Sequence, residues 1–119
     1  MYNGVLILES LKPGTVLTGI PLTVQKLSRI AVEGTSADQP RLWSLLEFSV
    51  DRGEDLADVL ADALDEPGWY ADFHNAQEIF VVFPGKVFRY DRGDDAVRET
   101  AKEYGRTLRI PDAQLDWTR

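Results

Sequence analysis

The residues best suited to chemistry lie on one predicted strand, Trp69 to His74. Tyr70, Asp72 and His74 alternate along this strand, so they share one face at a spacing of about 7 Å. An imidazole beside a carboxylate is a possible general base, because the carboxylate raises the pKa of the histidine and fixes its tautomer. Arg89, on a strand expected nearby, would hold an anionic substrate.

The simpler interpretation of this face is a solvated surface that ends in a turn at His74–Asn75. Neither a nucleophile nor an oxyanion-binding loop accompanies the histidine and the aspartate, so we favour this interpretation over an active site. If the face has a function, we expect binding by Tyr70 and Arg89 rather than catalysis. The sequence also has no GxGxxG and no Walker motif, so no cofactor is expected.

Metal binding needs three or four converging ligands, and the chain has one histidine and no cysteine. Asp91, Asp94 and Asp95 lie close together in sequence, but they lack the spacing of an EF-hand. Helix capping already accounts for Asp94 and Asp95. We therefore expect no metal site.

The acidic charge is concentrated in one segment. The chain has a formal charge of −7, and residues 51–85 carry nine acidic groups with Arg52 as their only basic one. This excess argues against nucleic acid and anionic membranes as partners. Asp55, Asp58 and Asp62 would form the outer face of a helix. That face is either solvated or docks a basic protein partner, as in immunity-type inhibitors of nucleases, and such binding would weaken steeply with salt.

Two stretches have helical periodicity. From Glu54 to Leu64, apolar residues recur every three or four positions and make one apolar stripe, which Pro67–Gly68 ends. A second helix is predicted to begin at Asp94 or Asp95, either of which is a suitable N-cap, and to end near Gly105 or Arg106.

Strands are predicted at residues 5–9, 21–32, 41–50, 69–74, 78–83 and 86–91. Residues 5–8 and 78–83 are apolar on both faces, which is typical of strands covered on both sides. Broken alternation near Gln25–Lys26 predicts a β-bulge. Pro84–Gly85 predicts a loop of more than two residues, because its favoured turns mismatch the twist of a tight hairpin. The order strand, strand, strand, helix, strand, strand, strand, helix indicates an α+β fold, with two main helices on a mostly antiparallel sheet of about six strands.

Two tryptophans suggest how one face of that sheet is covered. Trp43 shares a strand face with Leu45 and Glu47, while Trp117 lies almost at the end of the chain. Two helices leave part of a six-stranded sheet bare. A homodimer through the bare face, or the C-terminal tail folded over it, would bury both tryptophans.

Length and composition indicate a single soluble domain covering residues 1–119. The chain is 44% hydrophobic and 28% charged, as in ordinary globular proteins. No apolar run reaches the roughly 18 residues of a membrane span, and the N-terminus lacks the pattern of a signal peptide. A cytoplasmic location is therefore expected.

Four motifs resemble those of a group of small uncharacterised actinobacterial proteins: GWYADF (68–73), EIFVVFPGKVFRY (78–90), YGR (104–106) and IPDAQLDW (110–117). The resemblance covers most of residues 41–117 and implies no activity, cofactor or catalytic residue. From the residues themselves, we expect a small protein-interaction or regulatory domain that acts by binding. The alternatives are an acidic, immunity-like inhibitor and a small enzyme that uses His74 with Asp72.

Overall fold

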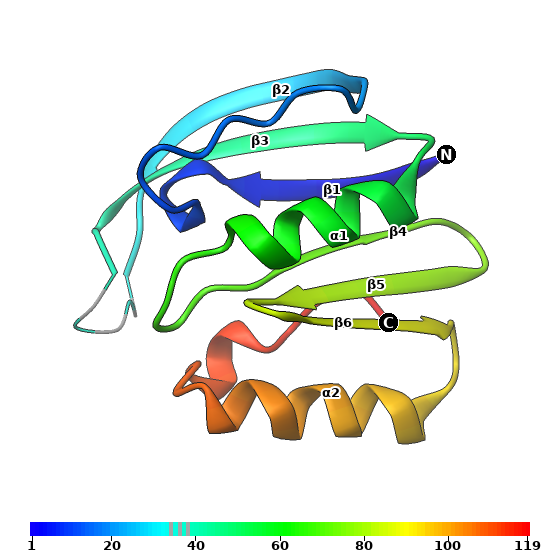
Figure 1. Ribbon diagram of the computed structural model, residues 1–119. Helices are drawn as coiled ribbons and strands as arrows, with labels where there is room; N and C mark the ends of the chain where they lie inside the picture. The colour runs from blue at the N-terminus through cyan, green and yellow to red at the C-terminus, as the bar shows by residue number, and fades with distance from the viewer. Residues whose placement is uncertain (34, 36, 38) are drawn as a thin grey trace.

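The computed structural model describes residues 1–33, 35, 37 and 39–119 (Figure 1). In these residues, six strands form one antiparallel sheet in the order β2-β3-β1-β4-β5-β6. Two α-helices pack on this sheet, so the predicted α+β class and the predicted order of elements are confirmed. The strands are β1 (Tyr2–Ile7), β2 (Leu22–Ala31), β3 (Leu42–Val50), β4 (Ala71–His74), β5 (Glu78–Phe83) and β6 (Lys86–Asp91).

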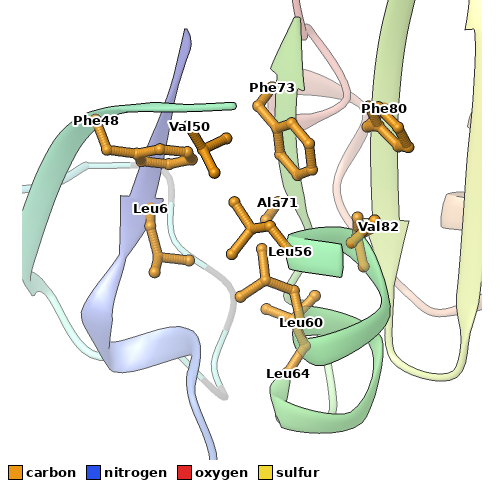
Figure 2. Close-up of a cluster of buried hydrophobic side chains, with 11 residues drawn as sticks. Leu6, Phe48, Val50, Leu56, Leu60, Leu64, Ala71, Phe73, Phe80 and Val82 are labelled. Carbon is orange, nitrogen blue, oxygen red and sulfur yellow. The ribbon is translucent and has the colours of Figure 1, made fainter. Parts of the chain in front are cut away.

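Helix α1 (Gly53–Ala63) covers one face of the sheet, here called the front face (Figure 1). Its predicted apolar stripe is confirmed, because Leu56 and Leu60 are buried and point towards the strands while the aspartates face solvent. Figure 2 shows these leucines packed against side chains from β1, β3, β4 and β5. The front core consists of Leu6, Phe48, Val50, Leu56, Ala57, Leu60, Leu64, Ala71, Phe73, Phe80 and Val82.

Helix α2 (Asp95–Thr107) covers the opposite face, here called the back face. The predicted capping is confirmed, since the Asp94 side chain accepts a hydrogen bond from the Val97 backbone N–H at 3.2 Å. Residues 108–119, which follow α2, are here called the C-terminal tail. Ala101 of α2 packs over β5 and β6 together with Leu115 and Trp117 of this tail. The back core is therefore confined to the β4–β5–β6 half of the sheet.

Strands β1 and β4 approach each other closely at Gly4. A Cβ at this position would lie 2.7 Å from the Asp72 carbonyl oxygen and 2.7 Å from the Phe73 Cβ, so only glycine fits without displacement. This contact between β1 and β4 joins the three strands β2, β3 and β1 to the three strands β4, β5 and β6. It also sets the position of Asp72 beside Val5, with which it is paired across the two strands.

The two halves of the sheet are covered unevenly. The segment before β2 contributes Leu11, Leu17 and Ile20 to the front core, whereas Val24 and Leu27 of β2 point to the same face and remain 59% and 62% exposed. On the back face, α2 and the tail stop at β4. Val5 therefore remains 43% exposed and Ile30 remains 39% exposed. Strands β1, β2 and β3 leave an apolar area of the back face uncovered.

Three local predictions concern the bulge in β2, the burial of residues 5–8 and the turn between β5 and β6. The bulge in β2 is confirmed by a register shift between Val24 and Lys26. The expectation that residues 5–8 are covered on both sides is wrong, because Val5 and Leu8 are partly exposed. The expected longer loop at Pro84–Gly85 is also wrong, since Phe83 pairs directly with Lys86. Gly85 adopts a φ of 73°, and its N–H donates to the Ala61 carbonyl at 2.9 Å, so α1 holds the tight turn.

Candidate binding site on the uncovered face

A hollow of about 310 Å³ lies on the uncovered part of the back face. Its floor consists of Val5 and Ile7 from β1 and Trp43 and Leu45 from β3. These side chains share one face because alternate strand residues point the same way and Ile7 is paired with Leu45. The floor is therefore an apolar surface that no element of the fold covers.

Two tryptophans form one side of the hollow. The rings of Trp43 and Trp69 lie 5.5 Å apart, and both line the hollow. Trp69 is buried, whereas Trp43 is half-buried and donates its indole N–H to the Pro40 carbonyl at 2.8 Å. This hydrogen bond fixes the orientation of the Trp43 ring. The site thus presents a preformed aromatic surface.

The C-terminal tail forms the opposite side. It includes a 3₁₀ turn at Asp112–Gln114, and Ala113, Gln114 and Asp116 line the hollow. The Tyr70 hydroxyl donates to the Gln114 carbonyl, while the side-chain amides of Gln114 and Gln39 hydrogen-bond each other at 2.9 and 3.2 Å. These contacts tie the tail to β4 and to the loop before β3.

The tail is held in place from α2 by Arg98. Its guanidinium donates to the carbonyls of Trp117 at 2.8 Å and Thr118 at 3.0 Å. It also stacks over the Trp117 ring, 5.2 Å from the centroid. The Trp117 indole N–H in turn donates to the Tyr90 hydroxyl at 2.7 Å. Trp117 is therefore buried because the tail packs against α2 and β6, whereas Trp43 stays partly exposed. The alternative in which the tail covers the bare face and buries both tryptophans is wrong.

Asp72 is the least exposed of the carboxylates that line the hollow. Burial is the main cause that raises its pKa to about 6, the nearby Asp116 carboxylate raises it further, and Arg98 partly offsets both effects. In the described part of the chain, neither a hydrogen bond nor an ion pair reaches the Asp72 carboxylate. At neutral pH the site therefore holds a half-buried, mostly ionised carboxylate without a cationic partner.

The rim of the hollow is acidic as well. Glu33 and Asp116 line it and are exposed, and none of its described lining residues is a lysine or an arginine. The neighbouring Tyr70 has a raised pKa, mainly from burial and then from Asp72 and Asp116, so its phenol stays neutral. The electrostatics of the hollow disfavour anions and favour cations.

His74 does not form the acid–base pair with Asp72 that the sequence offered as the alternative to a solvated face. Its pKa is lowered, first by burial and then by Arg92, whereas a pairing with Asp72 was expected to raise it. Its Nδ1 atom is buried and has no hydrogen-bond partner among the residues that the structure describes. His74 shares the back face with Tyr70 and Asp72, but it lies outside the residues that line the hollow. Among the described residues, no hydrogen bond links His74 to Asp72.

Arg89 lies on the opposite face of the sheet from this group. It is paired with Phe80 across β5 and β6, and its guanidinium lies 4.9 Å from the Phe80 ring on the front face. There it donates to Glu78 at 2.8 and 3.1 Å and to Glu54 at 3.3 Å. The expectation that Arg89 joins Tyr70, Asp72 and His74 is wrong, because the register of β6 turns it away from them.

The acidic face of α1 is exposed as expected. Asp55, Asp58 and Asp62 point to solvent, and Asp55 is paired with Arg52 at 2.7 Å. This surface lies on the front of the molecule, away from the hollow (Figure 1). The two candidate surfaces are therefore independent.

The described residues were also considered as metal ligands and as membrane-spanning helices. Among the described residues, no three side chains of the histidine, aspartate or glutamate type converge as metal ligands. No helix in the described ranges is long and apolar enough to cross a membrane.

Sequence reasoning found part of this site and missed the rest. It placed Tyr70 and Asp72 on one face and noted the face that Trp43 shares with Leu45. It missed Val5 and Ile7 because an apolar strand in mid-sheet is normally covered on both sides. It also missed Asp116, because no local pattern shows that the tail returns to β4.

The fold and the hollow together describe an α+β domain with a preformed, acid-rimmed apolar site. Comparison with protein-family models, with curated proteins and with solved structures finds no match.

Proposed function

We propose that this chain is a small binding domain rather than an enzyme, and that the back-face hollow holds its ligand. The observation that carries the proposal is the uncovered apolar floor at Val5, Ile7, Trp43 and Leu45. Burying apolar surface stabilises a complex by about 25 cal/mol per Å². A concave site gathers that surface against one ligand, and a volume of about 310 Å³ is within the usual range for small-molecule sites.

The polar groups of the hollow support binding rather than catalysis. Nucleophilic catalysis needs a nucleophile and an activating base within hydrogen-bond reach of each other. Tyr70 is engaged by the tail and stays neutral, and Asp72 has no basic or nucleophilic partner among the described side chains. His74 faces the same side but lies outside the hollow.

The acidic face of α1 supports the alternative proposal of an immunity-like inhibitor less well. A helix face that carries exposed carboxylates is convex and contributes little apolar area, while most binding energy at interfaces comes from buried anchors. Asp55 already has an intramolecular partner in Arg52. We therefore prefer the hollow as the site of function.

The proposal is tested by protein-observed NMR with a panel of neutral, cationic and anionic aromatic fragments. We expect the fragments that bind to perturb the backbone amides of Val5, Leu45, Tyr70 and Ala113. Amides on the outer face of α1 should not move. This distribution follows from the position of the apolar floor and its walls.

A matched pair of variants makes the test specific. Ala113→Trp places a large ring at the edge of the hollow and should abolish fragment binding. Ala76→Trp adds the same ring at an exposed turn outside the hollow and should leave binding unchanged. Fragments that bind equally to both variants, or that perturb amides elsewhere, would show that the hollow is not a binding site.

A further inference from the structure

We propose that the ligand of the hollow is a small organic cation, in which a protonated amine or amidine is attached to a flat apolar body. This inference rests on the proposed binding function and specifies the chemical class of the ligand. It follows from the combination of an unpaired carboxylate, an acidic rim and a pair of tryptophan rings in a single cavity.

The unpaired carboxylate calls for a positive charge. A half-buried carboxylate loses part of its hydration, and a second carboxylate nearby adds repulsion. Asp72 is in this situation beside Asp116, and Arg98, whose charge partly offsets both effects, donates hydrogen bonds to two carbonyls of the tail. An ammonium or amidinium group next to Asp72 would form a charge-assisted hydrogen bond and relieve both costs. Because no described residue forms an ion pair with Asp72, we expect the ligand to carry a positive charge.

The aromatic side determines the shape of the rest of the ligand. The indole rings of Trp43 and Trp69 adjoin the aliphatic floor at Ile7 and Leu45. A flat ring packs well between such surfaces, and aromatic pairs prefer centroid separations of about 4.5–7 Å. The volume of about 310 Å³ suits a molecule of this size better than a folded segment of a partner protein.

The test compares three probes of nearly the same shape. At pH 7.5 we expect 2-phenylethylamine, a cation, to bind about ten-fold more tightly than 2-phenylethanol, its neutral counterpart. Phenylacetate, an anion, should not bind detectably. A ten-fold difference corresponds to about 1.4 kcal/mol. Dissociation constants are measured from NMR titrations of the same amides.

Two variants locate the charge. In Asp72→Asn the ten-fold preference for the amine should fall to the small preference that the rim carboxylates sustain, because the amide carries no negative charge. In Asp91→Asn, which removes an exposed carboxylate of β6 away from the hollow, the ten-fold difference should persist. If the amine still bound ten-fold more tightly than the alcohol in Asp72→Asn, the assignment of the charge to this residue would be overturned.

A pH series gives an independent readout. The preference for the amine should shrink between pH 7.5 and pH 5, since the pKa of Asp72 is about 6 and the amine stays protonated throughout. The carboxylate is surrounded by titratable or charged groups from five elements, so the series is interpreted against Asp72→Asn, which retains all the others. These groups are Tyr70 just before β4, His74 of β4, Arg98 of α2, Asp116 of the tail, Glu33 after β2 and Glu47 of β3.

The outcomes separate the two proposals. Equal affinity of amine and alcohol in the wild-type protein would overturn the cation assignment while leaving the binding hollow in place. Absence of binding by all three probes, together with a fragment panel that avoids the hollow, would overturn both. N-acetyl-lysine N′-methylamide supplies a cation without a flat body. If it bound more tightly than 2-phenylethylamine, a lysine of a protein partner would replace the small molecule.

Discussion

At the scale of single residues, Asp72 is the most informative position in this chain. Alternation along β4 places it on the back face, the glycine at position 4 lets its strand come close to β1, and the tail brings a second carboxylate beside it. Each of these features adds to the cost of its negative charge. A charge that is costly in the free protein is a natural point of attachment for a cation, and its cost can be measured without any ligand.

Replacing Asp72 by asparagine should stabilise the protein at neutral pH. The pKa of Asp72 rises from 3.8 in the unfolded chain to about 6 in the fold, so the folded state holds its proton more tightly. Stability is therefore lost in the wild type as pH rises from about 4 to about 6, and Asp72→Asn escapes that loss. The gain should be near zero at pH 3.5 and should approach about 3 kcal/mol above pH 6.5, since one pKa unit corresponds to about 1.36 kcal/mol.

Urea denaturation of both proteins across this pH range measures the difference. Asp91→Asn, at an exposed site, serves as the control and should follow the wild type. Parallel stability curves for Asp72→Asn and the wild type would mean that the carboxylate is not desolvated in the fold.

At the scale of elements, the C-terminal tail is the part that completes the site. It carries Gln114 and Asp116 to the hollow, and α2 holds it through the buried Arg98 and its two backbone acceptors. Gly105 allows the close contact with Leu115, since a Cβ there would lie 2.8 Å from the Leu115 side chain. The tail is thus packed as part of the back core, and one wall of the hollow depends on that packing.

Replacing Arg98 by alanine should release the tail. Two carbonyls would lose a charged donor and Trp117 would lose a stacked cation, so we expect a loss of about 2–4 kcal/mol of stability. Hydrogen exchange of the amides at 112–118 should accelerate well beyond that of β5. Lys102→Ala on the same helix is the control, and tail amides that stay protected in Arg98→Ala would show that the tail does not depend on this arginine.

At the scale of the whole molecule, the placement of the helices explains both the site and the limits of sequence reasoning. The α1 stripe and the β2 bulge were predictable, because each depends on the local pattern of apolar residues. Which face each helix covers depends on contacts between distant segments. The sequence pattern of residues 5–8 is that of a covered strand, yet α2 packs over β5 and β6 and leaves Val5 of β1 43% exposed.

The same distinction applies to the candidate site. Tyr70 and Asp72 lie on one face because strand alternation is local, so their placement was predictable. Arg89 was misplaced because its face depends on the pairing of β6 with β5. Asp116 joined the site through a tail that follows α2, and no pattern near Asp72 indicates this. Packing between distant segments thus places the polar face of Tyr70 and Asp72 in the wall of a hollow.

The central claim is that the bare half of the back face binds a small ligand, and intermolecular nuclear Overhauser effects test it most directly. With 2-phenylethylamine at saturation, we predict contacts from its ring protons to the methyl groups of Val5, Ile7 and Leu45. Val16, Val24 and Leu27 are more exposed apolar residues outside the hollow, with 78%, 59% and 62% of their surface accessible. Contacts to those three methyl-bearing side chains instead of the floor would show unspecific adhesion and would contradict the account.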